Sequence, residues 1–307
     1  MFEQRTSSSL NALLKELVQE AVLVLLDILL LVLKILYDIA LGIYRLCIPV
    51  EEKSVTGEIV LITGTGHGIG KELALKYASL GAIVVCLDVN EEGNNETVNE
   101  INENGALKAY GYKCDVSNRE EVLKIAKKVK EEVGDVTILI NNAGIMPSFT
   151  LMNHTPEQIK RIFDINVLAH FWIFQAFLPN MIQRNYGHIV ALSSMAGVIG
   201  QPNIVPYSAS KFAVRGLMES LCEELRWMNK EKPLNIKFTT VYPYMINTGL
   251  CKNPRYRFKN LMPLVSTKQA VNVIVKAQRQ NTKEISIPAY WHYVNIILRC
   301  VIIHTYI

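Results

Sequence analysis

The stretch Glu58-Ile-Val-Leu-Ile-Thr-Gly-Thr-Gly-His-Gly-Ile-Gly70 decides the fold of this 307-residue chain. Its first six residues form a short apolar run, which is typical of a parallel strand buried on both faces. The glycines that follow permit a tight turn. The segment from about Gly68 to Leu80 then carries apolar residues on one side, which predicts a helix. Strand, turn and helix in this order form one unit of an α/β sheet.

The alternation of strands and helices continues along the chain. Further strands are predicted at residues 82–88, 108–113, 137–141, 188–192, 235–241 and 284–287. Three helix starts have the spacing of capping boxes, formed by Ser117 with Glu120, Thr155 with Gln158, and Ser266 with Gln269. This pattern predicts a doubly wound parallel sheet, the Rossmann fold. The stretch 242–265 has no clear period and is interpreted as a lid over a pocket.

Two features predict a bound dinucleotide. Glycines at 64, 68 and 70 let the backbone approach a pyrophosphate at the positive end of a helix. The next strand ends in Asp88, about 20 residues later, where a carboxylate holds the ribose hydroxyls of NAD and repels the extra phosphate of NADP. No lysine or arginine replaces it in the glycine turn or directly after Asp88. We therefore expect NAD, with NADP as the less favoured alternative.

A second motif, Tyr207-Ser-Ala-Ser-Lys211, predicts acid–base chemistry. Tyrosine and lysine four residues apart lie on the same face of a helix. A neighbouring ammonium favours the phenolate and so lowers the pKa of the phenol. Ser194 precedes Tyr207 by thirteen residues. Such a Tyr–Lys pair also occurs on exposed helix faces and is weak evidence by itself. The prediction of acid–base chemistry therefore depends on its combination with the glycine turn.

Together these residues resemble the short-chain dehydrogenase/reductase family, over residues 53–288. Besides the glycine turn, the matching positions are Asp115-Val116, Asn141-Asn-Ala-Gly144, Asn166 in Asp-Ile-Asn-Val, Ser194, Tyr207 and Lys211. Within the family the chain looks most similar to the membrane-associated branch that contains 17β-hydroxysteroid and retinol dehydrogenases.

The resemblance implies roles for individual residues. Tyr207 is the general acid/base, and Lys211 lowers its pKa and holds the nicotinamide ribose. Ser194 binds the substrate oxygen, and Asn166 supports a water chain that relays protons to Lys211. The implied cofactor-binding residues are Gly64, Gly68, Ile69, Gly70, Asp88, Asp115, Val116, Asn142, Ala143, Gly144, Tyr207, Lys211, Pro243, Ile246 and Thr248.

One departure from the family is visible after residue 242. Many relatives have Pro-Gly where this chain has Pro243-Tyr244. Two interpretations of Tyr244 remain open: it shapes the substrate pocket, or it packs within the lid.

The N-terminal segment predicts a membrane anchor. Residues 13–50 are mostly apolar, and their charged residues fall in one stripe about 40° wide on a helix; these are Glu16, Glu20, Asp27, Lys34, Asp38 and Arg45. Charges in mid-bilayer are costly, so we favour a helix lying in the interface, or a hairpin-like anchor, over a simple span. A helix that packs on its own domain or self-associates is the alternative.

Composition sets further bounds. The net charge of +4 is dispersed and argues against nucleic acid. Six scattered cysteines suit a reducing compartment. The histidines show no metal-ligand spacing, so we expect no metal. The predicted organisation is an N-terminal leader and hydrophobic membrane-anchoring helix (1–50), a Rossmann-fold catalytic domain (51–288) and an apolar C-terminal tail in possible contact with a membrane (289–307).

These observations predict a membrane-associated NAD-dependent oxidoreductase that interconverts a lipophilic alcohol, retinol-like or hydroxysteroid-like, and its carbonyl. The resemblance also implies a homodimer at the endoplasmic reticulum membrane or lipid droplet, with the catalytic domain facing the cytosol. Two alternatives remain open. One is a scaffold protein on a membrane or lipid-droplet surface with a vestigial dehydrogenase domain, and the other is an NADPH-dependent carbonyl reductase.

Overall fold

The computed structural model describes residues 15, 18–37, 40, 50–103, 108–228, 234–250 and 264–291. The chain divides into two units, Met1–Glu51 and Glu52–Ile307. In the first unit, residues 18–37 form a continuous helix whose side chains are all exposed. Glu20, Asp27 and Lys34 of the predicted stripe lie on this helix, and the stripe's other members lie outside the described residues.

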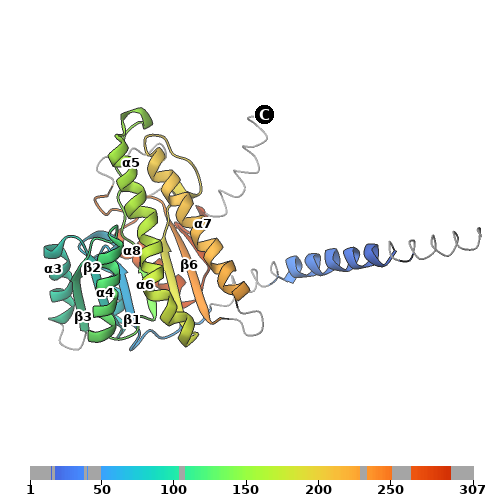
Figure 1. Ribbon diagram of the computed structural model, residues 1–307, viewed down its shortest axis with the longest axis horizontal. Coiled ribbons are helices and arrows are strands. Elements are labelled where there is room, and N and C mark those ends of the chain that lie inside the picture. The colour runs from blue at the N-terminus through green and yellow to red at the C-terminus, as the bar shows by residue number, and fades with distance from the viewer. Residues whose placement is uncertain are drawn as a thin grey trace, which may run out of the picture. The chain divides into compact units, whose positions relative to one another are not determined.

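The second unit contains one sheet of seven parallel strands in the order β3-β2-β1-β4-β5-β6-β7 (Figure 1). The strands are β1 Ile59–Thr63, β2 Ile83–Asp88, β3 Lys108–Lys113, β4 Ile138–Asn141, β5 Gly187–Leu192, β6 Ile236–Pro243 and β7 Glu284–Ile287. All seven predicted strands are present, with bounds that differ by one or two residues at most. The doubly wound parallel fold is therefore confirmed.

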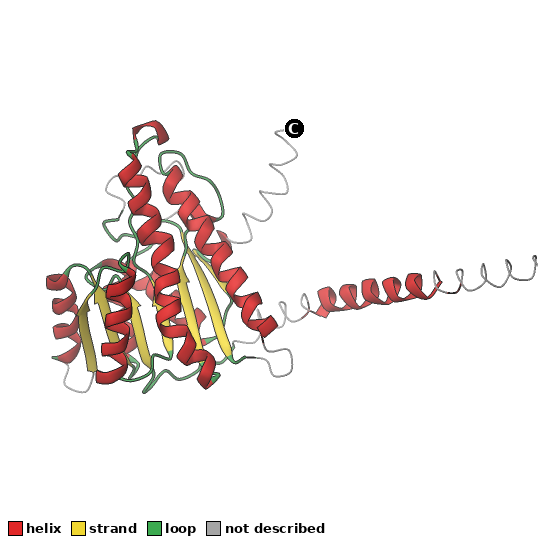
Figure 2. Ribbon diagram, viewed as in Figure 1, coloured by secondary structure: helices red, strands yellow, loops and turns green. Residues whose placement is uncertain are grey.

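Helices cover both faces of the sheet, as Figure 2 shows. One layer contains α2 (Gly68–Ser79), α3 (Glu91–Asn102) and α8 (Thr267–Arg279), and the other contains α4 (Arg119–Glu132), α6 (Ala169–Arg184) and α7 (Val205–Met228). Helix α5 (Pro156–Phe163) continues into α6 through a π-helical turn, Asp164–Leu168. Short 3₁₀ turns lie at Leu151–Asn153 and Met195–Gly197.

Strand β1 shows why a central strand of this sheet is apolar along its whole length. Leu61 packs in the core under α4, α6 and α7, whereas Val60 and Ile62 pack under α2 and α8. Because both faces of the sheet are covered, successive residues are buried on opposite sides. The strand order reverses between β1 and β4, and this reversal opens a crevice at their carboxyl ends.

Two of the three predicted capping boxes are confirmed, at Thr155 and Ser266. The prediction at Ser117 was wrong, because α4 begins after Asn118, whose side chain accepts hydrogen bonds from the first amides of the helix. The Ser117 hydroxyl instead donates to the Asp115 carboxylate at 2.6 Å. The helix begins one residue later than predicted, so Asn118 rather than Ser117 occupies the N-cap position.

Within the described residues, one helix is long and apolar enough to cross a membrane by length and composition alone. It runs from Pro156 to Arg184; its most apolar 18-residue window has a mean hydropathy of 1.3, and 56% of that window is buried in the protein. This continuous α5–α6 helix packs against the sheet, so it is a core helix of the fold.

Candidate active site

The glycine-rich turn brings helix α2 unusually close to strand β1. Gly64 and Gly68 have φ angles of 75° and 62°, a region that favours glycine. At Gly70, an added Cβ would lie 1.8 Å from the carbonyl oxygen of Gly64. Only glycine permits this approach, which places backbone amides and the helix N-terminus at the crevice. That geometry suits a pyrophosphate.

Asp88 ends β2 and points back to the glycine turn. Its carboxylate oxygens accept hydrogen bonds from the backbone amides of Gly66 and Asn90, each at 2.8 Å. An added Cβ on Gly66 would lie only 3.1 Å from this carboxylate. These contacts hold a negative charge beside the turn, as expected of a group that selects between ribose and phosphorylated ribose.

The loop after β4 is bonded to the glycine turn. The Asn142 side-chain amide donates to the carbonyl oxygens of Thr63 and Gly64, at 2.9 and 3.2 Å. In return, the Thr63 hydroxyl accepts from the backbone amides of Asn142 and Ala143, both at 3.0 Å. The two sides of the crevice are therefore held at a set separation.

The two predicted residues after β3 have different surroundings. Asp115 is half-buried and accepts hydrogen bonds from the amide and the hydroxyl of Ser117. Val116 is buried in the core on the side of α4 and α6. Both residues lie at the carboxyl edge of the sheet, and neither lines the cavity described next.

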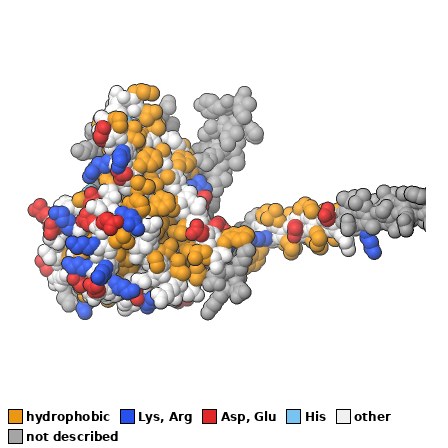
Figure 3. Space-filling model, in the orientation of Figure 1, with side chains coloured by type: hydrophobic (Ala, Val, Ile, Leu, Met, Phe, Trp, Pro, Cys, Tyr) orange, Lys and Arg blue, Asp and Glu red, His pale blue; other side chains and the backbone are white. Residues whose placement is uncertain are grey.

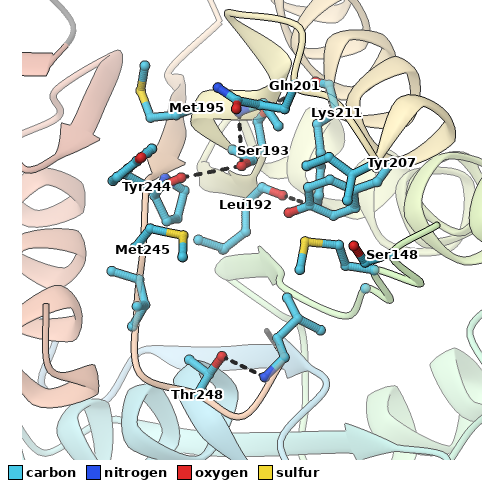
Figure 4. A pocket seen from close by; sticks show the side chains of 18 of the residues that line it. Ser148, Leu192, Ser193, Met195, Gln201, Tyr207, Lys211, Tyr244, Met245 and Thr248 are labelled. Carbon is cyan, nitrogen blue, oxygen red and sulfur yellow. Dashed lines mark hydrogen bonds between the residues drawn. The ribbon is translucent and has the colours of Figure 1, made fainter. Parts of the chain in front are cut away.

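Ser194, Tyr207 and Lys211 come together in one cavity of about 590 Å³ (Figure 4). Ser194 follows β5, and the other two residues lie in the first turns of α7. All three side chains are buried. The Lys211 ammonium lies 5.7 Å from the centre of the Tyr207 ring. The structure thus joins a hydroxyl, a phenol and an ammonium that three separate parts of the sequence supply.

Burial dominates the electrostatics of this group. Burial raises the pKa of Tyr207, and the hydrogen bond with Ser194 offsets only part of that rise. It also lowers the pKa of Lys211 to about 8. The resemblance implies that Lys211 lowers the pKa of Tyr207. In the structure this pKa is instead raised, because a buried phenolate loses its water.

Asn166 lies in the π-helical turn between α5 and α6, a type of irregularity that is frequent at functional sites. Its side chain accepts from the Ile145 amide at 2.9 Å and donates to the Ile145 carbonyl and to the Ser210 hydroxyl, both at 3.0 Å. Ser210 in turn donates to the Tyr207 carbonyl at 2.6 Å. Asn166 therefore links the loop after β4 to α7. We did not predict Ser210, because serine is too common on helices to be a signal.

Comparison with known proteins agrees with this geometry. A sequence model of the family described as "short chain dehydrogenase" matches residues 58–259. The chain is 43% identical to short-chain dehydrogenase/reductase family 16C member 6 of Bos taurus, over 88% of this chain and 84% of the relative. It is 41% identical to 17-beta-hydroxysteroid dehydrogenase 13 of Homo sapiens, over 90% and 89% respectively.

The chain belongs to the short-chain dehydrogenase/reductase family. A third relative, epidermal retinol dehydrogenase 2 of Homo sapiens, is 42% identical over 80% of this chain and 79% of its own length. A solved family member from Burkholderia phymatum in complex with NAD matches with a TM-score of 0.71 and 26% identity, over 82% of this chain and 96% of that structure. The protein is thus an NAD(P)-dependent oxidoreductase of the alcohol dehydrogenase type.

The rest of the dehydrogenase cavity comes from loops at the carboxyl edge of the sheet. Of the predicted cofactor residues, its lining includes Ile69, Asn142, Gly144, Pro243, Ile246 and Thr248. Gly64 and Ala143 lie in the two loops beside it, and Gly68 and Gly70 lie in the first turn of α2. Sequence reasoning missed much of the apolar wall, which consists of Met146, Phe149, Met195, Met245 and Leu250. These residues come from separate loops and share no period or motif.

Proposed function

We propose that this dehydrogenase is membrane-associated, uses NAD, and interconverts a lipophilic alcohol, retinol-like or hydroxysteroid-like, and its carbonyl. One observation carries the proposal. The hydroxyls of Ser194 and Tyr207 lie in a cavity with both polar and apolar lining, and the Lys211 ammonium is 5.7 Å from the Tyr207 ring. The apolar lining includes Met146, Phe149, Met195, Met245 and Leu250. A few polar groups placed among apolar side chains orient a lipophilic ligand by its single oxygen.

The proposed chemistry assigns one task to each side chain. Ser194 holds the alcohol oxygen, and Tyr207 takes the hydroxyl proton during oxidation or returns it during reduction. When bound, the nicotinamide supplies the hydride acceptor. The Lys211 ammonium has three N–H donors, and it gives one to the carbonyl oxygen of Leu192 at 2.7 Å. Its other donors can serve a ribose hydroxyl and the phenolate of Tyr207.

The residues present fit NAD. The close contact at Gly70 leaves room for a pyrophosphate at the N-terminus of α2, and Asp88 lies beside the same turn. A carboxylate there repels a 2′-phosphate, since two like charges at contact distance are unfavourable. This arrangement favours NAD over NADP.

Two relatives are named for their substrates, as a hydroxysteroid dehydrogenase and a retinol dehydrogenase. These names support a lipophilic alcohol for this chain too. The helix over residues 18–37 supports delivery of such a substrate from lipid, because its many exposed leucines, valines and isoleucines have no cover in the described residues. We place it in the interface of the endoplasmic reticulum membrane or a lipid droplet.

The orientation proposed, with the catalytic domain in the cytosol, has a direct test. Asn95 is the acceptor of an Asn-Glu-Thr glycosylation sequon, and it is exposed on α3. We expect Asn95 to remain without glycan when the protein is expressed in mammalian cells. A glycan there, removed by a glycosidase and absent from Asn95→Gln, would place the domain in the lumen.

We further propose a homodimer through α6 and α7. An apolar groove runs between these two helices, where hydrophobic side chains gather in Figure 3. Phe171 is 40% exposed in this groove. Sedimentation in detergent tests the proposal: the wild type should be dimeric and Phe171→Glu monomeric. A wild-type monomer would refute it.

The proposed function is tested by NADH production from NAD and all-trans-retinol or, separately, estradiol, with the protein in liposomes. We expect one substrate to be turned over and Tyr207→Phe to abolish turnover while NAD binding persists. The matched control is Tyr186→Phe, since Tyr186 bonds Glu58 away from the cavity. Turnover that survives in Tyr207→Phe would overturn the mechanism. NAD binding without turnover of either alcohol would favour the scaffold alternative.

A further inference from the structure

The pocket wall opposite the catalytic group rests on a tryptophan near the end of the described chain. Tyr244 lines the cavity, across from Tyr207 in Figure 4. Its ring stacks on the ring of Trp291, with centroids 5.7 Å apart and planes inclined by 26°. Trp291 is 7% exposed and is not itself among the cavity-lining residues. It therefore supports the wall from behind.

The main chain holds this pair in place from both sides. The Tyr244 amide donates to the carbonyl oxygen of Ile287, the last residue of β7, at 2.9 Å. Within that strand, the Ser286 hydroxyl lies 2.9 Å from the carbonyl oxygens of both Pro288 and Ala289, so it can donate to either of them. The turn that follows β7 is thus fixed by its own hydrogen bonds. It presents Trp291 to Tyr244 in one orientation.

Trp291 also belongs to a small buried cluster behind this wall, with Met195, Val198 and Tyr242, against which Tyr244 packs. Met195 lines the cavity beside Ser194. Trp291 thus stacks on one pocket residue and shares a cluster with another, and an indole ring leaves a large void when it is removed. Neighbouring side chains move into such a void only in part.

We propose that Trp291 is a positioning residue for substrate selection: by stacking on Tyr244 it sets the width of the pocket on this side, and so determines which lipophilic alcohols fit. The inference rests on the proposed function, whose substrate site it deepens. It also answers the question left open for Tyr244, which both lines the pocket and packs against the segment after β7. Without the indole, the Tyr244 ring can turn away and the pocket widens, which favours a broad rigid ligand over a slender one.

Ligand binding, rather than turnover, tests this proposal. Equilibrium dialysis with radiolabelled all-trans-retinol and estradiol, with NAD present, gives the ratio of the two dissociation constants. Trp291→Ala should shift this ratio towards estradiol by about fivefold or more, as expected for the loss of a buried aromatic contact. Trp291→Phe keeps a ring against Tyr244 and should restore the wild-type ratio. The matched control is Trp227→Ala, since Trp227 is 63% exposed at the end of α7.

A double substitution separates positioning from general loosening. Tyr244→Ala should shift the ratio as Trp291→Ala does, and combining the two should add little, because both act through one contact. NAD affinity should stay the same in all variants. An unchanged ratio in Trp291→Ala, or an equal loss of NAD and both alcohols, would overturn the proposal. If Trp291→Ala fails to fold, Trp291→Leu and Tyr244→Ala carry the comparison. Binding of both alcohols without NADH production would refute the proposed function but would not contradict the role proposed for Trp291.

Discussion

The side-chain nitrogen of Lys211 lies 2.7 Å from the carbonyl oxygen of Leu192, which ties helix α7 to the end of strand β5. The lysine is 4% exposed, so its ammonium has exchanged most of its water for this carbonyl. One acceptor replaces several waters, and the pKa of Lys211 falls to about 8 as a result. The bond that places the lysine beside Tyr207 thus comes at a cost in stability.

That cost predicts that, without cofactor, the free energy of unfolding of the wild type and that of Lys211→Met differ by an amount that depends on pH. Between pH 8 and the ordinary lysine value of 10.5, the unfolded chain holds the proton more tightly than the folded protein. The free energy of unfolding of the wild type, relative to Lys211→Met, should therefore rise with pH across this window by up to about 3 kcal/mol. Urea unfolding of both proteins at several pH values measures it. A difference that stays constant with pH would contradict the lowered pKa.

Gly70→Ala should destabilise the protein and weaken NAD binding. Its methyl group would overlap the carbonyl of Gly64, and backbone cannot move aside as a side chain can. We expect a loss of about 1–3 kcal/mol or more in the free energy of unfolding. Gly216→Ala is the matched control, because nothing lies within 4 Å of a Cβ at that helical position. It should gain up to about 1 kcal/mol from helix propensity. Equal stability of the two variants would refute the steric argument.

Asp88→Ala should relax the preference for NAD. Removing the carboxylate removes the repulsion of a 2′-phosphate, so the ratio of NADP to NAD affinity should rise by about tenfold or more. Calorimetric titration of both dinucleotides measures this ratio without the need for substrate. Asp135→Asn is the control, since Asp135 pairs with Arg184 away from the glycine turn. An unchanged ratio in Asp88→Ala would instead support the reductase alternative.

Leu29→Asp should weaken membrane binding more than Lys34→Gln does. On the helix over residues 18–37, Leu29 lies about 160° from the direction of the charged stripe at Glu20, Asp27 and Lys34, counting about 100° per residue. A carboxylate there would enter lipid on the side of the helix opposite the stripe, where a charge without a partner is costly. Flotation of the full chain with neutral lipid vesicles compares the two variants. Equal flotation would contradict an in-plane helix with a water-facing stripe.

Local pattern was sufficient for much of the fold. Apolar runs predicted the central strands, because a strand covered on both faces needs no polar side. Gly70 was identified from spacing alone, and its tight contact with Gly64 explains why that spacing works. The capping prediction failed at Ser117 because two adjacent residues, Ser117 and Asn118, are both good N-cap residues, and spacing did not show that the helix begins after Asn118.

The sequence by itself determined the order of the elements, the dinucleotide turn, the acid at Asp88 and the placing of Tyr207 and Lys211 on one helix face. Each depends on residues close together in the chain. Only the tertiary structure decided that burial raises the pKa of Tyr207, that Asn166 bonds Ser210, and that Trp291 supports Tyr244. These depend on lost water and on contacts between distant segments. Neither follows from spacing, because packing brings those groups together only when the whole sheet has formed.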